Sequence, residues 1–232
     1  GLSAVLLTHG HADAVLGLNC LREVQLAGEP ADSWAVSSRL PIYATKDTAD
    51  VVHATFGYMF PGGGDGKRQV GSFAMVDISG LEPFCPIPGL RVQPLLVYHG
   101  GSYACLGFAF GAANEFVYLS DVSKVPPDTM ALLQENKIQV LVVDALLKSK
   151  SIPPHFGLEE ALGLVRALGP ARALLIGMSC EFDHGRDDAE LQALAREGLD
   201  VRLSYDGMVL ELDLAPAPAD GSAGPARTRG ET

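Results

Sequence analysis

The chain alternates between short runs of apolar residues and longer stretches in which apolar residues recur every three or four positions. Short β-prone runs predict strands, and the longer spacing predicts amphipathic helices. Strands are predicted over residues 4–7, 41–44, 69–78, 90–98, 103–110, 116–119, 138–143, 171–176, 201–204 and 208–214. Helices are predicted over residues 12–26, 48–56, 127–134, 158–168 and 188–197. Because helices separate buried strands in the second half, we predict an α/β protein whose sheets are covered by helices.

Two segments lack both patterns. Residues 61–66 are mostly glycine and are predicted to form a flexible loop that is too irregular for a phosphate-binding loop. Residues 215–232 consist mainly of Ala, Pro, Gly and Ser, which predicts a disordered tail. The chain of 232 residues is therefore expected to form one large domain over residues 1–214, followed by that tail.

The composition favours a folded, soluble protein with a small-molecule partner. Apolar residues make up 47% of the chain and charged residues 19%, so a sizeable core is available. The formal charge of -11 argues against sequence-independent binding of nucleic acid, which needs clustered Lys and Arg. No apolar run reaches the length of a membrane span, so no membrane partner is predicted, and a homodimer is left open.

The four cysteines are widely separated and form no CxxC pair. This spacing argues against a disulfide framework and favours a reducing compartment, so we predict a cytoplasmic protein without excluding an organelle. Cys20 and Cys105 lie in apolar neighbourhoods and are expected in the core, and His53, inside a predicted helix, is expected to have a structural role.

The first candidate for chemistry is the motif HGHAD that follows the first predicted strand. His9 and His11 stand two positions apart, and Asp13 follows two positions later. Side chains with this spacing project to the same side of an extended segment. Imidazole nitrogens together with a carboxylate suit zinc, manganese or iron. The motif therefore predicts a metal site where a strand meets a helix.

Other candidate ligands also follow predicted strands. His99 comes after residues 92–98, Asp121 after residues 117–120, and Cys180 after residues 174–178. A single polar residue in such a place is more often structural, but several strand ends together favour a metal site. Asp144 also ends a predicted strand, where it could support a neighbouring ligand or cap a helix.

These motifs, in this order, resemble the metallo-β-lactamase superfamily. Residues 11–18 (HADAVLGL), 118–123 (YLSDVS) and 205–207 (YDG) further resemble the branch that contains phosphoribosyl cyclic phosphodiesterase and its uncharacterised plant and fungal relatives. The resemblance implies a metallo-β-lactamase-like hydrolase domain, an αββα sandwich of two mixed β-sheets flanked by helices. Its first N-terminal strands are expected to be missing here, since the chain starts close to the HGHAD strand.

The resemblance also implies a ligand set. His9, His11 and His99 would hold a first metal ion, Asp121 would bridge, and Asp13 would help to hold a second. Two positions depart from the family pattern, which has histidines where this chain has Ala14 and Cys180. A thiolate can bind zinc, whereas alanine cannot, so one or two ions (Zn²⁺ or Mn²⁺, with Fe²⁺ as a further option) remain open.

The implied reaction is hydrolysis of a small phosphodiester, which could be cyclic. A metal ion lowers the pKa of a bound water towards about 7 and so supplies hydroxide as the nucleophile. Asp13 or Asp121 would orient that nucleophile. His155 matches a family histidine that lies near the substrate phosphate, and it would protonate the departing oxygen, because histidine titrates near neutrality.

Two other functions are compatible with the same residues. A mononuclear iron oxidoreductase could use the same scaffold with fewer ligands. A catalytically degenerate binding protein would account for Ala14, Cys180 and the short N-terminus. Metal content and hydrolytic turnover discriminate among the three.

Overall fold

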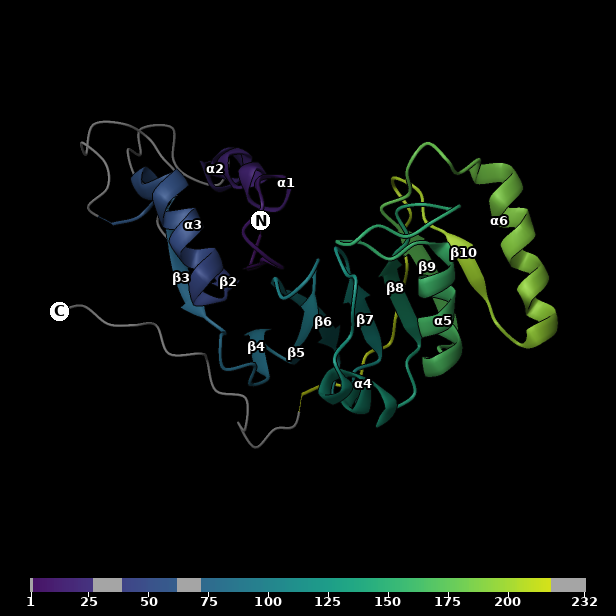
Figure 1. Cartoon of the computed structure of the whole chain (residues 1–232). Helices are drawn as coiled ribbons and strands as arrows, with labels where there is room; N and C mark the ends of the chain where they lie inside the picture. Colours follow the sequence, from purple (N-terminus) through teal and green to yellow (C-terminus); the bar gives the residue numbers. More distant parts are fainter. Residues whose placement is uncertain (1, 27–38, 62–71, 218–232) are drawn as a thin grey trace. The chain divides into compact units, whose positions relative to one another are not determined.

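The computed structural model describes residues 2–26, 39–61 and 72–217 (Figure 1). These residues fall into two compact units. The first consists of the described residues up to Pro88, and the second begins at Gly89. The predicted α/β class is confirmed. The prediction of a single domain over residues 1–214 stays a prediction.

The first unit contains a parallel sheet in the order β1-β2-β3. Its strands and helices are β1 (Val5–Leu6), α1 (Ala12–Val15), η1 (Leu16–Cys20), α2 (Leu21–Leu26), β2 (Leu40–Ala44), α3 (Lys46–Phe56), η2 (Gly57–Met59), β3 (Phe73–Asp77) and β4 (Phe84–Ile87). β4 was missed from the sequence because it contains Pro86, and proline argues against a strand.

The core of the first unit lies between this sheet and α3. Val52 and Phe56, four positions apart on α3, share one face and join Ile42 and Phe73 in a buried cluster. The helix starts at a capping residue, since the Thr45 hydroxyl accepts a hydrogen bond from the Thr48 amide. The apolar spacing and the capping residue thus both indicate the position of α3. The predicted helix over residues 48–56 began two residues later than the observed one.

The second unit contains a mixed sheet in the order β10-β9-β8-β7-β6-β5. Its strands and helices are β5 (Leu90–Tyr98), β6 (Ala104–Phe110), β7 (Phe116–Leu119), α4 (Pro127–Gln134), β8 (Val140–Asp144), α5 (Leu158–Leu168), β9 (Arg172–Ile176), α6 (His184–Gln192), η3 (Ala193–Glu197) and β10 (Val201–Leu203). The strands and helices of this unit were predicted, with α6 and η3 predicted as one helix, and most bounds agree within two residues.

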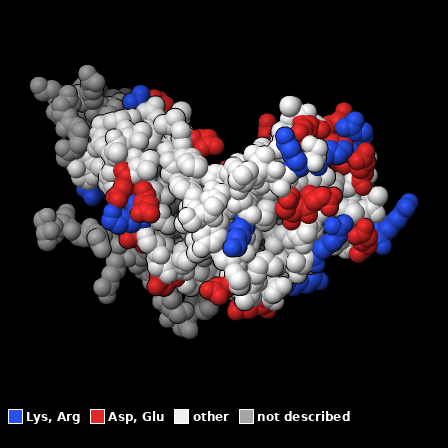
Figure 2. Space-filling view, in the orientation of Figure 1, with Lys and Arg blue, Asp and Glu red and all other residues white. Residues whose placement is uncertain are grey.

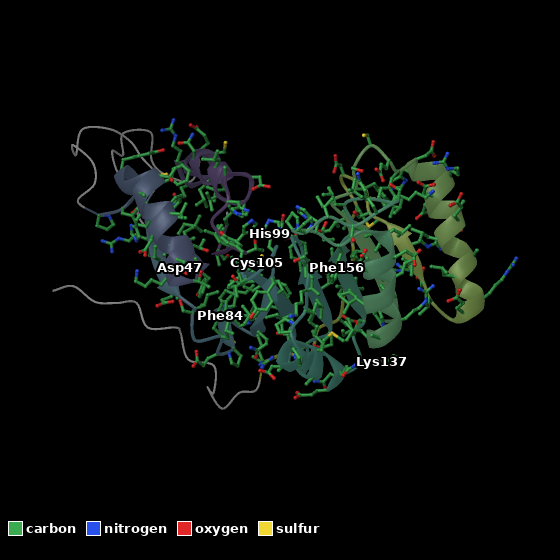
Figure 3. All side chains as sticks on the ribbon, in the orientation of Figure 1. Asp47, Phe84, His99, Cys105, Lys137 and Phe156 are labelled. Carbon is green, nitrogen blue, oxygen red and sulfur yellow. The ribbon has the colours of Figure 1, made fainter. Side chains whose placement is uncertain are left out.

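Strand direction places several loops at one end of this sheet. Strands β7, β8, β9 and β10 are parallel, and β5 runs in the same direction because both β5 and β7 are antiparallel to β6. The carboxyl ends of β5, β7, β8 and β9 therefore lie at the same end. Figure 3 shows this polarity, with His99 after β5 at one end and Lys137, which precedes β8, at the other.

The core of the second unit lies between the sheet and α5. Every residue of β8 is buried, and α5 buries Leu162 and Val165 on one face. Cys105 and Phe156 belong to the same buried cluster (Figure 3). The expected burial of Cys105 is confirmed, whereas Cys20 is exposed at the end of η1, so the prediction that Cys20 belongs to the core is wrong.

The predicted strand over residues 208–214 is not a strand in the structure. Met208, Leu210 and Leu212 pack against Val142 and Leu174 on a face of the second sheet. An alternating pattern marks one buried side of an extended segment, but it does not say whether the backbone pairs with a sheet edge or crosses a face. Here the segment crosses the face.

Two predicted helices also differ in detail. The helix over residues 12–26 consists of α1, η1 and α2, so its middle is a 3₁₀ segment. The helix over residues 188–197 begins earlier, at His184, because the Asp183 carboxylate accepts a hydrogen bond from the Arg186 amide and caps α6.

The segments predicted as flexible lie largely outside the described residues. Of residues 61–66, only residue 61 is described. Of the tail, Ala215 and Ala217 are described, and their amides donate to Glu115 Oε1 (2.8 Å) and the Gly89 carbonyl (3.0 Å). Among the helices of the described residues, none has both the length and the apolar character needed to cross a membrane.

We expect Leu175→Ala to destabilise the protein. Leu175 is fully buried in the core of the second unit, so truncation leaves a cavity that should cost about 2–5 kcal/mol of unfolding free energy. Denaturant unfolding measures this loss. Val209→Ala is the matched control, because Val209 is 83% exposed, and its effect should stay within about 0.5 kcal/mol. Equal effects of the two variants would contradict the described packing.

Candidate metal centre

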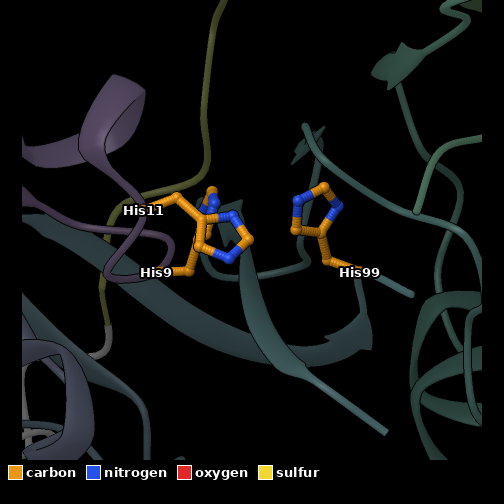
Figure 4. A group of neighbouring side chains, drawn as sticks. All are labelled: His9, His11 and His99. Carbon is orange, nitrogen blue, oxygen red and sulfur yellow. The ribbon is translucent and has the colours of Figure 1, made fainter. Parts of the chain in front are cut away.

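The histidine pair of the first unit lies on the loop that follows β1 (Figure 4). The rings of His9 and His11 have centroids 4.6 Å apart and an edge-to-face arrangement. His9 is buried and His11 exposed, and the Thr8 hydroxyl lies 2.9 Å from His9 Nδ1. The predicted proximity of the two side chains is confirmed. Their role as metal ligands stays a prediction.

Asp13 and Ala14 follow this pair in α1. Asp13 is exposed in the first turn of the helix. Ala14, which stands where the resembling family has a histidine, packs against the core of the first unit. Within the described residues, Asp13 does not belong to a close group of potential metal-binding atoms. Its predicted role at a second metal ion stays a prediction.

The second unit brings together a group of potential ligands. His99, Asp121 and His155 each offer one metal-binding atom, and these atoms all lie within 4.8 Å of one another. His99 follows β5, Asp121 follows β7, and His155 lies on the loop between β8 and α5. The shared carboxyl end of these strands explains why residues far apart in sequence converge. Two imidazoles and a carboxylate fit zinc, manganese or iron.

The ring of His99 is held by a backbone carbonyl. His99 Nδ1 lies 2.7 Å from the carbonyl oxygen of Pro154. A carbonyl can only accept, so Nδ1 carries the proton and donates it, and Nε2 then carries the lone pair that a metal ion requires. Figure 4 shows His99 on the loop that follows β5. The tautomer of His99 is therefore set for coordination through Nε2.

This contact depends on Gly100. Gly100 has a φ of +84°, and a Cβ atom there would lie 3.3 Å from the Cα of Pro154. Its amide donates to the Ser123 hydroxyl at 2.8 Å. A side chain at position 100 would therefore be strained and would press on the segment that holds His99.

Asp121 has a φ of +49°, in the left-handed region that few residues other than glycine adopt. It lies two residues after the end of β7, and the next residue, Val122, is buried in the core. Backbone strain at a non-glycine residue persists only where the surrounding structure enforces it, and it is concentrated at functional sites.

His155 is paired with a buried carboxylate. His155 Nδ1 lies 2.7 Å from Asp144 Oδ2, and the His155 and His99 rings have centroids 4.8 Å apart. Burial raises the pKa of Asp144, and the bond to His155 partly opposes that shift. Of the two sequence-based interpretations of Asp144, support of a neighbouring side chain is the one that the structure bears out.

Cys180 is exposed on the loop between β9 and α6. Within the described residues, it does not belong to a close group of potential metal-binding atoms. The loop is held by its neighbour Glu181, whose Oε2 accepts hydrogen bonds from the amides of Lys148 (3.0 Å) and Ser149 (3.1 Å). The prediction that Cys180 binds metal in place of a histidine stays a prediction.

Ion pairs to the buried carboxylate of Asp187 connect the loop after β8 to α6. Lys148 Nζ lies 2.7 Å from Oδ1 of Asp187, and Arg186 Nε lies 3.0 Å from the same oxygen. Asp187 is only 2% exposed. Lys148 and Arg186 hold the pKa of Asp187 well below its usual range. These contacts tie the loop that carries His155 to the start of α6.

Comparison with known proteins shows the family. A family model for the Beta-lactamase superfamily domain matches residues 1–178, and the chain therefore belongs to this family. The fold is that of metallo-β-lactamase-like hydrolases, as the sequence motifs predicted.

Solved structures agree with this assignment. The structure of a diphosphatase from the PhnP family is 26% identical, with a TM-score of 0.72 over 93% of this chain and 74% of that chain. YhfI from Bacillus subtilis, a metallo-β-lactamase fold protein, is 17% identical, with a TM-score of 0.66 over 90% of this chain and 77% of that chain. The short form of human tRNase Z is 17% identical, with a TM-score of 0.58 over 91% and 80% of the two chains. The last two likenesses concern the fold alone.

One curated relative is an octanoyltransferase of Porphyromonas gingivalis (strain ATCC BAA-308 / W83). It is 27% identical over 180 residues, which make up 77% of this chain and 32% of the relative. The matched region therefore spans about a third of that relative, and the relative's name describes the whole protein.

The ion pair of Asp187 predicts a pH-dependent contribution to stability. Because the folded-state pKa of Asp187 is depressed, its contribution is fully present above the unfolded-state value of about 4 and is lost as the pH falls towards the folded-state value. Asp187→Asn should therefore be less stable than the wild type at pH 7. The difference should shrink below about pH 4, as urea titrations at several pH values would show. A difference that does not change with pH would contradict the ionic role.

Proposed function

We propose that this protein is a metal-dependent hydrolase that cleaves a small phosphodiester, as in the branch that contains phosphoribosyl cyclic phosphodiesterase. The observation that carries the proposal is the group formed by His99, Asp121 and His155 at the carboxyl end of the second sheet. Fold alone would not support it, since the same scaffold hosts unrelated reactions.

The donor set suits Zn²⁺ or Mn²⁺, which when bound would act as a Lewis acid on the phosphate and activate a water molecule. His99 would coordinate through Nε2, because Nδ1 donates to the Pro154 carbonyl. Asp121 would supply a carboxylate oxygen and orient the attacking water. His155 in its imidazolium form would give the Nε2 proton to the departing oxygen as the phosphorus–oxygen bond breaks, while Nδ1 stays bonded to Asp144. In this role His155 would act beside the metal ion without coordinating it.

Two observations favour a small phosphate ester as the substrate. The similar protein with the TM-score of 0.72 is a diphosphatase, and its 26% identity spans most of this chain. The formal charge of -11 disfavours a long polyanion such as RNA. On the face shown in Figure 2, acidic and basic side chains are interspersed over the second unit, and no extended basic track is seen among the described residues.

The direct test measures metal content and turnover together. The full chain is purified without added metal, its zinc, manganese and iron contents are determined, and hydrolysis of bis-para-nitrophenyl phosphate is followed after addition of Zn²⁺ or Mn²⁺. Bound metal with phosphodiester turnover supports the proposal. One iron ion per chain without turnover supports the oxidoreductase, and absence of metal and turnover supports a binding protein. A dinucleoside diphosphate as a second substrate separates a phosphodiesterase from a diphosphatase.

His99→Ala should reduce metal content and turnover, because His99 is a buried ligand whose tautomer is already set. The loss of turnover should be on the order of 100-fold or more. His53→Ala is the matched control, since His53 is exposed on α3 and its ring packs against the ring of Phe60. Unchanged metal content in His99→Ala would refute the site.

His11→Ala tests the sequence-based prediction that the first unit's histidine pair binds the metal ion. The expected result is loss of bound metal and of hydrolysis, measured by metal analysis and by bis-para-nitrophenyl phosphate turnover. Cys20→Ser serves as the control, because Cys20 is exposed on the same unit and is assigned no ligand role. Full activity and full metal content in the His11 variant would remove the pair from the ligand set.

A further inference from the structure

We propose that Asp144 is a positioning residue that fixes the tautomer of His155 and holds the backbone next to Asp121. The inference rests on the proposed function, since it assigns a role at the same centre. It concerns how the ligand group of the second unit is kept in place, and Asp144 itself need not touch metal or substrate.

The first argument is the pairing with His155. Asp144 is the last residue of β8 and is 3% exposed, and its Oδ2 lies 2.7 Å from His155 Nδ1. An ionised carboxylate can only accept hydrogen bonds, so Nδ1 must carry a proton. In the neutral ring, Nε2 then carries the lone pair. The carboxylate thus selects one of two tautomers, just as the Pro154 carbonyl does for His99.

The second argument is that the same carboxylate lies beside the loop of Asp121. The backbone of Val122 is close enough to Asp144 to help lower the pKa of that carboxyl. Val122 directly follows Asp121, whose left-handed backbone needs support from its surroundings. The Val122 carbonyl in turn accepts from the Phe156 amide at 2.6 Å. Asp144 therefore lies where the loop of Asp121 meets the loop of His155.

The third argument is a glycine that makes room for the carboxylate. Gly177, just after β9, has a φ of +73°, and a Cβ atom at that position would lie 2.7 Å from Asp144 Oδ1. A side chain at position 177 would therefore be strained and would force the Asp144 carboxylate to shift. The end of β9 is shaped around Asp144, which a simple helix cap would not require.

Asp144→Asn is the sharpest substitution, because it keeps the size of the side chain and removes one acceptor. The carboxylate offers acceptor oxygens only, whereas an amide offers one acceptor oxygen and one NH₂ donor. If the NH₂ group faces His155, it favours a lone pair on Nδ1. The tautomer of His155 should then reverse.

The tautomer can be measured by ¹⁵N-histidine NMR on the full chain, as purified and with Zn²⁺ added. Work at about pH 8 keeps an ordinary histidine neutral. His155→Gln assigns the resonance. The wild type should show the Nδ1–H form of His155, and Asp144→Asn should show a large population of the Nε2–H form. Turnover should fall by about 10–100-fold, mostly in kcat with KM little changed.

Asp187→Asn is the matched control, because it makes the same chemical change at a carboxylate of similar burial in the same unit. It should lower the unfolding midpoint and leave the tautomer of His155 unchanged. The proposal would be overturned if Asp144→Asn left the tautomer as in the wild type, or if Asp187→Asn changed it equally. The NMR result does not require turnover, so it tests Asp144 even if no phosphodiester is hydrolysed.

Discussion

The candidate centre depends on the direction of the strands in the second sheet. Because β5, β7, β8 and β9 all point the same way, the residues that follow them meet at one end of the sheet. His99, Asp121 and His155 come from three of these connections and converge there. Reversal of any one strand would carry its polar residue to the opposite end, so strand pairing is the constraint on which the chemistry rests.

Strand direction brings the side chains together, but hydrogen bonds orient them. Pro154 and Asp144 each present an acceptor to the Nδ1 atom of a histidine, at 2.7 Å in both cases. A ring held in this way can present only Nε2 to a metal ion or to a substrate. Both acceptors lie in or next to the connection between β8 and α5, so this connection contributes to the centre more than its single histidine suggests.

The departures from the family pattern are local and have different physical consequences. Ala14 packs into the core of the first unit, and the position therefore serves packing instead of coordination. Cys180 stays exposed on a loop that Glu181 fastens to Lys148 and Ser149. Membership of the family thus establishes the fold. The number of bound metal ions depends on these two side chains, and metal analysis measures it.

The sequence by itself determined the order of helices and strands, the α/β class and the first histidine motif, because hydrophobic spacing and short-range motifs are local properties. It also placed His99 and Asp121 after predicted strands, and the family resemblance singled out His155 shortly before the predicted helix over residues 158–168. It wrongly predicted a strand over residues 208–214 and a buried Cys20. Alternating apolar residues or apolar sequence neighbours do not determine which part of the fold, if any, packs on a segment. Only the tertiary structure decided that Asp144 supports His155, because that contact depends on strand register and on the return of a loop to the end of β8.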